Sequence, residues 1–111
     1  MTTPFEELAN LDKLIHEPAR LAILTTLSAC ENADFLSLRR LTGLSDGNLS
    51  VQLTKLEEAG LVDIQKKFVA RKPSTLLKIT KKGRAAIQHH WEQLNAIKQH
   101  ADAWKDDSPR K

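Results

Sequence analysis

The sequence predicts a mainly helical fold class in which one small β-hairpin precedes a long final helix. Two observations predict it: apolar residues recur at helical spacing in five segments, and two short stretches within residues 61–80 have the apolar and β-branched content of strands. A third observation is the length of 111 residues, which suits one domain with a modest core. We therefore expect a single domain over residues 1–105.

The first segment begins with a helix-capping pattern. Thr3 is followed three residues later by Glu6, and Pro4 occupies the first helical position, where its missing N–H costs nothing. Apolar residues then follow at helical spacing, which predicts a first short helix. These residues are Phe5, Leu8, Leu11 and Ile15.

A second helix is predicted to begin at Pro18. The residue before a proline is disfavoured in the α region, so Glu17 should interrupt the preceding helix. The new helix runs through Leu21, Leu24 and Leu27 and ends near Cys30. We expect this single cysteine to be a buried small apolar residue rather than a redox-sensing thiol.

Residues 34–60 have the pattern of a helix-turn-helix. Asp34 is a candidate N-cap for the segment FLSLRRLT, in which Phe35, Leu38 and Leu41 form one apolar stripe, and Gly43 is placed to end that helix. Ser45 can cap the next helix after a very short turn. That second helix spans residues 45–59, closes at Gly60, and directs three leucines to one side: Leu49, Leu53 and Leu56.

Residues 61–80 predict a two-stranded hairpin. The stretches LVDIQKKFVA and TLLKIT have the composition of strands, and between them lies RKPS. Because a proline cannot donate a hydrogen bond to a sheet, Pro73 is expected in a loop, which makes the hairpin tip basic.

A long final helix is predicted for residues 81–105, with Thr80 as its cap. At about 24 residues it would extend roughly 36 Å, farther than the domain from which it grows. The outer part of its apolar stripe must therefore cover another surface, whereas residues 106–111 are expected to be a disordered tail. The stripe consists of Ile87, Trp91, Leu94, Ile97, Ala101 and Trp104.

Composition narrows the class of protein. No apolar run approaches the roughly 20 residues of a membrane-spanning helix, and the N-terminus does not resemble an export signal, so we expect a cytoplasmic protein without membrane contact. The net charge is +3, but residues 39–84 hold 11 basic and 4 acidic side chains. This basic middle suggests an anionic partner. No cluster of catalytic residues or cofactor motif is present, so we expect neither an enzyme nor a bound cofactor.

The predicted order of helices, hairpin and final helix is that of a winged helix, which inserts its recognition helix into the DNA major groove. The recognition helix is residues 45–59. Asn48, Val51 and Gln52 are suited to base edges, because Asn and Gln pair with adenine and Val can contact a thymine methyl group. Ser45 and Ser50 are suited to phosphate, and Lys55 to phosphate or guanine. Gly47 indicates either close approach of the DNA backbone or packing against the preceding helix.

The hairpin, or wing, supplies further candidate DNA contacts. Its basic residues are Lys66, Lys67, Arg71 and Lys72. Arg71 near the tip suits a narrow minor groove, and Lys72 suits phosphate. A solvated basic loop is the alternative. Arg39, Arg40, Lys81, Lys82 and Arg84 are additional candidates for phosphate contacts.

The chain resembles the small winged-helix regulators related to the MarR and ArsR groups. The resemblance spans residues 16–87 and depends on HEPARLAIL, on LSDGNLSVQLTKLEEAGLV, and on the wing with its R-x-P-x-T and IT-x-x-G patterns. It implies a homodimeric transcriptional regulator that binds double-stranded DNA at an inverted-repeat operator, and it leaves open a small-molecule effector that the sequence does not name. It also implies a dimer interface on the terminal helices, composed of Phe5, Leu8, Trp91, Leu94, Ile97, Ala101 and Trp104.

Three alternatives remain open. Relatives that sense metals carry ligands on the last helix, but here only His89 and His100 have the required separation, so we expect no metal site. A redox-responsive regulator would use Cys30. A winged helix can also bind proteins instead of DNA, but the exposed face of its third helix would then be acidic or broadly apolar.

Overall fold

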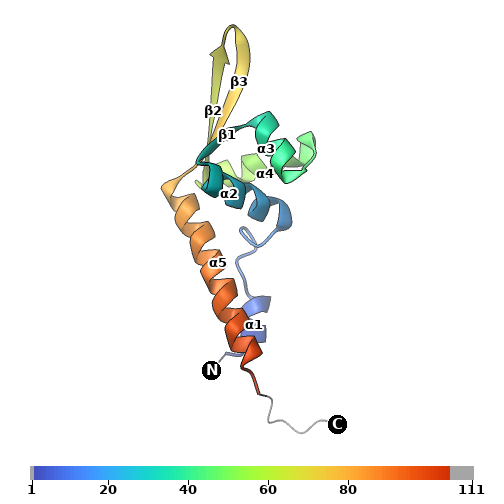
Figure 1. The fold of residues 1–111 in the computed structure, drawn as a ribbon, viewed down its shortest axis with the longest axis vertical. Coiled ribbons are helices and arrows are strands. Elements are labelled where there is room, and N and C mark those ends of the chain that lie inside the picture. The colour runs from blue at the N-terminus through green and yellow to red at the C-terminus, as the bar shows by residue number, and fades with distance from the viewer. Residues whose placement is uncertain (1, 106–111) are drawn as a thin grey trace.

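The computed structural model describes residues 2–105, in which helices and strands follow one another in the predicted order (Figure 1). The predicted tail, residues 106–111, lies outside the described residues. Within them the elements are α1 (Pro4–Ala9), α2 (Pro18–Cys30), β1 (Asn32–Asp34), α3 (Phe35–Thr42), α4 (Asp46–Glu58), β2 (Val62–Val69), β3 (Lys72–Ile79) and α5 (Lys81–Asp102).

The molecule is elongated (Figure 1). α2, α3 and α4 gather beside the base of the sheet, and the β2–β3 hairpin projects beyond them at one end. α5 extends from the sheet toward the opposite end, where α1 lies against its distal half. The wing and the terminal helices are thus at opposite ends of the described chain.

The predicted helix starts are confirmed by their capping hydrogen bonds. In each of four helices, the cap side chain accepts a hydrogen bond from the backbone N–H three residues later, and α1 has the full reciprocal capping box. Gly43 ends α3 with a φ of 72°, a left-handed conformation that glycine adopts readily. The four caps are Thr3, Asp34, Ser45 and Thr80.

The first helix is shorter than its apolar spacing predicted. α1 ends at Ala9, so Leu11 and Ile15 lie in an irregular segment, although both are buried. In that segment the backbone N–H of Leu14 donates to the Asp12 carboxylate at 2.9 Å, a local turn that replaces helical bonding.

Two further burial predictions are wrong. Cys30 is exposed, because it is the last residue of α2 and the helix there has passed the edge of the core. Leu41 is 59% exposed whereas Leu38 is fully buried. Successive steps of three residues fall behind the 3.6-residue period, so Leu41 is rotated away from the core.

The sheet has a third strand that the sequence did not predict. β1 pairs antiparallel with β3, which also pairs with β2, so the strand order is β1-β3-β2. β1 is only three residues long, too short to show an apolar alternation. The prediction of a hairpin within residues 61–80 is confirmed, but its loop is not RKPS.

The hairpin turns at Ala70 and Arg71 instead. Both have positive φ values, 51° and 65°, as a two-residue turn between twisted strands requires. Pro73 belongs to β3 and faces Phe68. In such a hairpin the pair that flanks the turn exchanges hydrogen bonds and the next pair does not, so the nitrogen of Pro73 points away from β2. β1 pairs only with residues 76–78 of β3, so the edge of β3 at Pro73 is open. The missing N–H of Pro73 therefore costs no hydrogen bond between strands.

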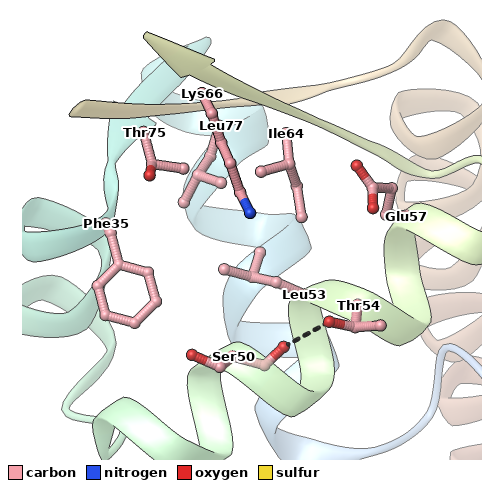
Figure 2. Close-up of a pocket in the computed structure, with 9 residues that line it drawn as sticks. All are labelled: Phe35, Ser50, Leu53, Thr54, Glu57, Ile64, Lys66, Thr75 and Leu77. Carbon is pink, nitrogen blue, oxygen red and sulfur yellow. Dashed lines mark hydrogen bonds between the residues drawn. The ribbon is translucent and has the colours of Figure 1, made fainter. Parts of the chain in front are cut away.

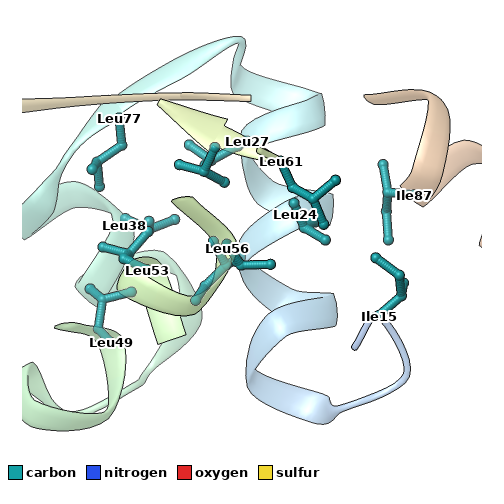
Figure 3. Close-up of a cluster of buried hydrophobic side chains, with 12 residues drawn as sticks. Ile15, Leu24, Leu27, Leu38, Leu49, Leu53, Leu56, Leu61, Leu77 and Ile87 are labelled. Carbon is teal, nitrogen blue, oxygen red and sulfur yellow. The ribbon is translucent and has the colours of Figure 1, made fainter. Parts of the chain in front are cut away.

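The core is an aliphatic cluster between α2, α3, α4, the base of the sheet and the start of α5 (Figure 3). The three leucines of α4 are buried in it as predicted, at no more than 3% exposure. They pack in the same cluster as Leu24 and Leu27 of α2. Burial of a leucine side chain contributes about 1.5–3 kcal/mol, so this contact fixes α4 with its other face outward.

The start of α5 is seated against the strand that begins the wing. Gly83 is buried in the first turn, and a Cβ placed there would collide with the carbonyl oxygen of Leu61 and approach Ile79 Cγ1 to 2.9 Å. The glycine of the IT-x-x-G pattern is therefore required by close packing. Thr80 adds a hydrogen bond to this contact, because its hydroxyl donates to the Gly60 carbonyl at 2.7 Å.

A pair of histidines joins the irregular N-terminal segment to α5. His16 Nδ1 and His90 Nε2 are 3.0 Å apart, so one ring nitrogen donates to the other, and His90 is 2% exposed. Burial lowers the pKa of His90 below its usual value of 6.5, and the nearby His16 and His89 lower it further. Asp12 acts in the opposite direction and raises the pKa.

None of the helices formed by residues 2–105 is long and apolar enough to span a membrane.

The two helical glycines should respond oppositely to alanine. Gly83→Ala is expected to lower the free energy of unfolding by about 1–3 kcal/mol, because the added methyl group meets backbone. Gly47→Ala is the matched control. It should raise stability by up to about 1 kcal/mol, because its Cβ meets no atom of residues 2–105 within 4 Å and alanine is the better helix former. Urea unfolding measures the free energy of unfolding of both variants. Equal values for Gly83→Ala and Gly47→Ala would show that the start of α5 does not pack closely against Leu61.

The buried histidine should make stability depend on pH. An unfolded chain protonates His90 near pH 6.5, whereas the folded protein resists that proton, so the free energy of unfolding should fall as the pH drops below about 6.5. His90→Gln should make this decline shallower, and the exposed neighbour substitution His89→Gln should not. Thermal unfolding between about pH 7 and about pH 5 tests this, and equal pH dependence in all three proteins would contradict it.

Candidate nucleic-acid interface

The face of α4 opposite its leucines is open to solvent. Val51 is 52% exposed, although it is apolar and lies in the middle of the helix. The other candidate residues of this helix are also exposed, apart from Gln52, which is half-buried. The exposed candidates are Ser45, Gly47, Asn48, Ser50, Val51 and Lys55.

Gln52 is held by two hydrogen bonds within the protein. Its Oε1 accepts from Arg20 Nη1 at 2.6 Å, and its Nε2 donates to Asn48 Oδ1 at 3.0 Å. An amide nitrogen has two hydrogens, so Gln52 keeps one donor for a ligand. The structure thus places Gln52 at the centre of a chain of polar contacts that orients Asn48.

Arg20 anchors this chain to the segment that precedes α2. Its Nε donates to the Leu14 carbonyl at 2.6 Å and its Nη2 to the Lys13 carbonyl at 3.2 Å, and its side chain is only 12% exposed. Because the guanidinium is planar and offers five donors, one side chain can tie the N-terminal segment to the recognition helix. The sequence gives no sign of this, since Arg20 and Gln52 are 32 residues apart.

Glu17 completes the cluster. Its carboxylate accepts from the backbone N–H groups of Ala19 and Arg20, at 3.1 and 2.9 Å, and lies 3.8 Å from the Arg20 guanidinium. Partial burial acts to raise the pKa of Glu17, but these hydrogen bonds and the charges of Arg20 and Lys55 outweigh it and lower the pKa below the usual value. Lys55 therefore stands beside a carboxylate as well as on the exposed face.

Several other basic residues have structural partners. Arg39 Nη1 lies 2.8 Å from Asp46 Oδ1, an exposed ion pair between α3 and α4. Lys82 donates to the Ala59 carbonyl at 3.0 Å and Arg84 to the Ser28 carbonyl at 3.1 Å. Cations at these positions stabilise the C-terminal ends of α4 and α2.

Gly47 has no structural reason to be glycine in the described chain. An added Cβ would meet nothing within 4 Å among residues 2–105, so packing against the preceding helix does not account for it. Close approach of the DNA backbone, the other explanation that the sequence allowed, stays a prediction.

The wing candidates lie on two faces of the hairpin. Side chains alternate along a strand, so Lys67 and Lys72 share the face directed away from α4, whereas Lys66 shares the opposite face with Ile64. Arg71 occupies the turn itself. All of these cations are exposed. Between Asp63 and Glu92 the sequence contains eight basic residues and no acidic one, so every charged side chain of the hairpin beyond Asp63 is basic.

An open groove of about 720 Å³ separates the recognition helix from the wing (Figure 2). Ser50, Thr54 and Glu57 form its wall on α4, and the Thr54 hydroxyl donates to the Ser50 carbonyl at 3.0 Å. Figure 2 shows the Lys66 side chain extending from the sheet toward α4. The remaining lining residues are Phe35, Leu53, Ile64, Thr75 and Leu77.

The groove adds two hydroxyl residues, Thr54 and Thr75, that the sequence analysis did not select as candidates. It brings them to one concave surface with Lys66, one of the basic residues of the wing. Thr54 follows Ser50 by four residues, so helical spacing already placed the two on one face. The position of Lys66 and Thr75 opposite them depends on how the sheet packs on α4, and spacing does not reveal that.

The terminal helices expose part of the predicted apolar surface. Phe5 is 51%, Leu8 45% and Trp104 40% exposed, and the rings of Phe5 and Trp104 meet edge to face at 5.7 Å. Leu94 and Ala101 are half-buried. Ile97 is 3% exposed and belongs to the chain's own packing. Trp104 lies two residues past the end of α5, which is three residues shorter than predicted.

A second hollow, of about 470 Å³, lies between α2 and α5. Trp91, which is 48% exposed, lines it, and its indole N–H donates to the Thr25 hydroxyl at 3.2 Å. His89 and His100 do not come together with other ligands: residues 2–105 contain no group of three or more side chains suited to a metal ion.

Comparison with known proteins identifies a family for this chain. Residues 19–97 match a family described as a winged helix DNA-binding domain. An uncharacterized protein of Methanocaldococcus jannaschii is 37% identical over 78 residues, which cover 70% of this chain and 85% of that protein. A transcriptional regulator homologue from Pyrococcus horikoshii OT3 is 29% identical, with a TM-score of 0.80 over 87% of this chain and 98% of that chain.

The fold also matches a MarR family transcriptional regulator from Silicibacter pomeroyi. The TM-score is 0.64 at 20% identity, over 94% of this chain and 69% of that chain. An outward helix face, a basic hairpin and a groove between them define the class of winged-helix DNA-binding proteins. By its match over residues 19–97, the chain belongs to the winged helix DNA-binding domain family. Its fold is that of the MarR-type transcriptional regulators, which confirms the predicted fold class.

The contact between Arg20 and Gln52 should be measurable as a coupling free energy. In a double-mutant cycle of Arg20→Ala and Gln52→Ala, we expect about 1–2 kcal/mol of coupling, because the hydrogen bond is charge-assisted and shielded from solvent. Arg39→Ala with Asp46→Ala is the matched cycle for an exposed pair, which should give less than about 1 kcal/mol. Urea unfolding supplies both values. Equal or smaller coupling for Arg20 and Gln52 would mean that their contact does not hold α4.

Proposed function

We propose that this protein is a homodimeric transcriptional regulator that binds specific double-stranded DNA. α4 enters the major groove, and the wing contacts the backbone and the adjacent minor groove. The observation that carries the proposal is the outward face of α4, where exposed small, polar, apolar and basic side chains stand on a helix whose other face is locked into the core. A solvated surface does not need Val51 exposed or a glycine at position 47.

Base contacts are assigned to the middle of that face. Asn48, oriented by Gln52, can donate to and accept from an adenine edge, and Val51 can contact a thymine methyl group. Ser45 and Ser50 lie in or next to the first turn of α4, where backbone N–H groups and the helix dipole favour phosphate. Gly47 allows the sugar-phosphate backbone to approach this turn closely.

The groove between α4 and the wing is the assigned path for one DNA strand. A phosphate entering it would meet the Lys66 ammonium and the hydroxyl groups of Thr54 and Thr75. Glu57 at the same groove repels phosphate, so the strand should pass nearer Ser50 than Glu57. Lys67, Arg71 and Lys72 extend the positive surface along the wing.

The dimer is assigned to the terminal helices. Phe5, Leu8 and Trp104 form an exposed apolar patch on α1 and the end of α5, and the half-buried Leu94 and Ala101 are placed on the same helix. Such a patch on a small protein typically marks an interface. A two-fold dimer built there would present two recognition helices to half-sites about one helical turn apart. The hollow beside Trp91 offers space for an effector of unassigned chemistry.

Selection of duplexes from a random pool tests the proposal, followed by affinity measurements over a range of salt concentrations. An inverted repeat with half-sites about one turn apart is the expected product. Asn48→Ala should cost about 1–3 kcal/mol at the selected site and relax the preference at one position, because it removes a base contact. Lys72→Ala should weaken binding to all sequences and reduce the slope of log affinity against log salt by about 1.

Lys98→Ala is the matched control for charge. It also removes one cation, but Lys98 lies on α5 and pairs with Asp102 at 2.7 Å, far from the assigned interface. Its salt dependence should equal that of the wild type. If the wild type enriches no sequence and binds duplexes only weakly, the specific-binding proposal is wrong, and a protein partner for α4 becomes the better assignment.

A further inference from the structure

The tip of the wing carries an aromatic side chain that the fold does not use. Phe68 is 79% exposed, more than any other large apolar residue described in the chain, and its neighbour Val69 is 62% exposed. Pro73 faces Phe68 across the hairpin and can cover only one side of the ring. Neither Phe68 nor Val69 belongs to the aliphatic core.

Strand alternation places Phe68 on the face that forms the groove. Ile64 and Lys66 line the groove with α4, and Phe68 is the next residue on that face toward the tip. At about 3.3 Å per residue, the four residues from Ile64 carry the ring roughly 13 Å outward. Val69 points to the opposite face.

The charged residues nearest to Phe68 in the chain are all basic. Lys66, Lys67, Arg71 and Lys72 flank it within four positions of the chain, and the nearest acidic residues in the sequence are Asp63 and Glu92. The ion pairs described among residues 2–105 include none of these four cations. Lys66 shares the face of Phe68 and Arg71 occupies the adjacent turn, whereas Lys67 and Lys72 lie on the other face of the same tip. An apolar ring on a basic hairpin tip fits a partner with a polyanionic rim and an apolar interior, which is the chemistry of the DNA minor groove with its stacked bases.

We propose that Phe68 is a wedge that enters the minor groove flanking the α4 site and presses into a base step there. This rests on the proposed function, in which the wing contacts the minor groove next to the α4 site. That minor groove is centred about half a helical turn, roughly 17 Å, from the centre of the major groove. This is of the same order as the roughly 13 Å by which the hairpin extends beyond Ile64. An inserted phenyl ring unstacks the step and bends the duplex, so Phe68 selects flexible pyrimidine–purine steps without hydrogen-bonding to a base.

A structural role for the ring is separable from this one. A cross-strand contact with Pro73 would stabilise the hairpin, and its loss would weaken binding indirectly. Phe68→Thr addresses this, because threonine has a high strand propensity and keeps the hairpin while removing the ring. Val69→Thr is the matched control: it changes an exposed apolar residue at the same tip, on the other face.

The test measures the affinity of wild type, Phe68→Thr and Val69→Thr for the selected duplex, with either TA steps or a stiff A-tract in the flanks. We expect Phe68→Thr to lose about 10-fold in affinity on TA flanks, the effect of removing one aromatic ring from contact with bases. It should lose the preference for TA over A-tract flanks and keep the wild-type salt slope, because no cation is removed. Energy transfer between dyes at the duplex ends should report a smaller bend. Val69→Thr should match wild type in each respect.

Three results would overturn the wedge. If wild type binds DNA specifically but Phe68→Thr matches Val69→Thr in affinity and flank preference, the wedge is wrong and the proposed function stands. If wild type binds no duplex specifically, both fall. If Phe68→Thr leaves DNA binding intact but abolishes sedimentation of wild type with vesicles of anionic phospholipid, the tip contacts membrane instead.

Discussion

The packing of one row of leucines determines what this protein can present to a partner. Leu49, Leu53 and Leu56 lock α4 onto the core shared with α2, so the rotation of that helix about its axis is fixed by burial alone. The polar face that α4 contributes to the interface follows from that rotation. A helix turned by one residue would bury Ser50 and expose Leu49, and the groove beside the wing would lose the hydroxyl groups that α4 supplies.

Polar contacts then refine what apolar packing sets only coarsely. Arg20 joins the Lys13 and Leu14 carbonyls to Gln52, and Gln52 orients Asn48. The same N-terminal segment contacts α5 through His16 and His90. A displacement of the terminal helices therefore has a short, continuous path to the residues assigned to base contact. Such a path is a physical basis for coupling dimer geometry to DNA affinity, provided that the segment has two arrangements of similar energy.

Local signals accounted for most of the fold. Helix caps, a left-handed glycine and strand composition act within a few residues, so Ser45, Gly43 and the outer limits of the hairpin were predictable. The errors arose where tertiary contacts decide. β1 is a strand only because β3 lies beside it, Pro73 is tolerated because its side of the strand is open, and Cys30 is exposed because the core ends before the helix does. In the interface, exposure of the candidate residues followed from helical spacing. The hydrogen bond of Arg20 to Gln52, and the position of Lys66 and Thr54 at the same groove, depend on tertiary packing that the sequence does not show.

The proline in the wing has a consequence for solubility. A long hairpin with exposed Phe68 and Val69 would ordinarily invite the strand of another molecule to add to its open edge, the first step of aggregation. Pro73 lies on the outer edge of β3 without an N–H to offer, beside lysines that repel a second hairpin of the same charge. Pro73 therefore makes the outer edge of β3 near the tip unsuitable as a template for self-association. Along β2, the other edge of the sheet, the charges of Lys66 and Lys67 oppose strand addition.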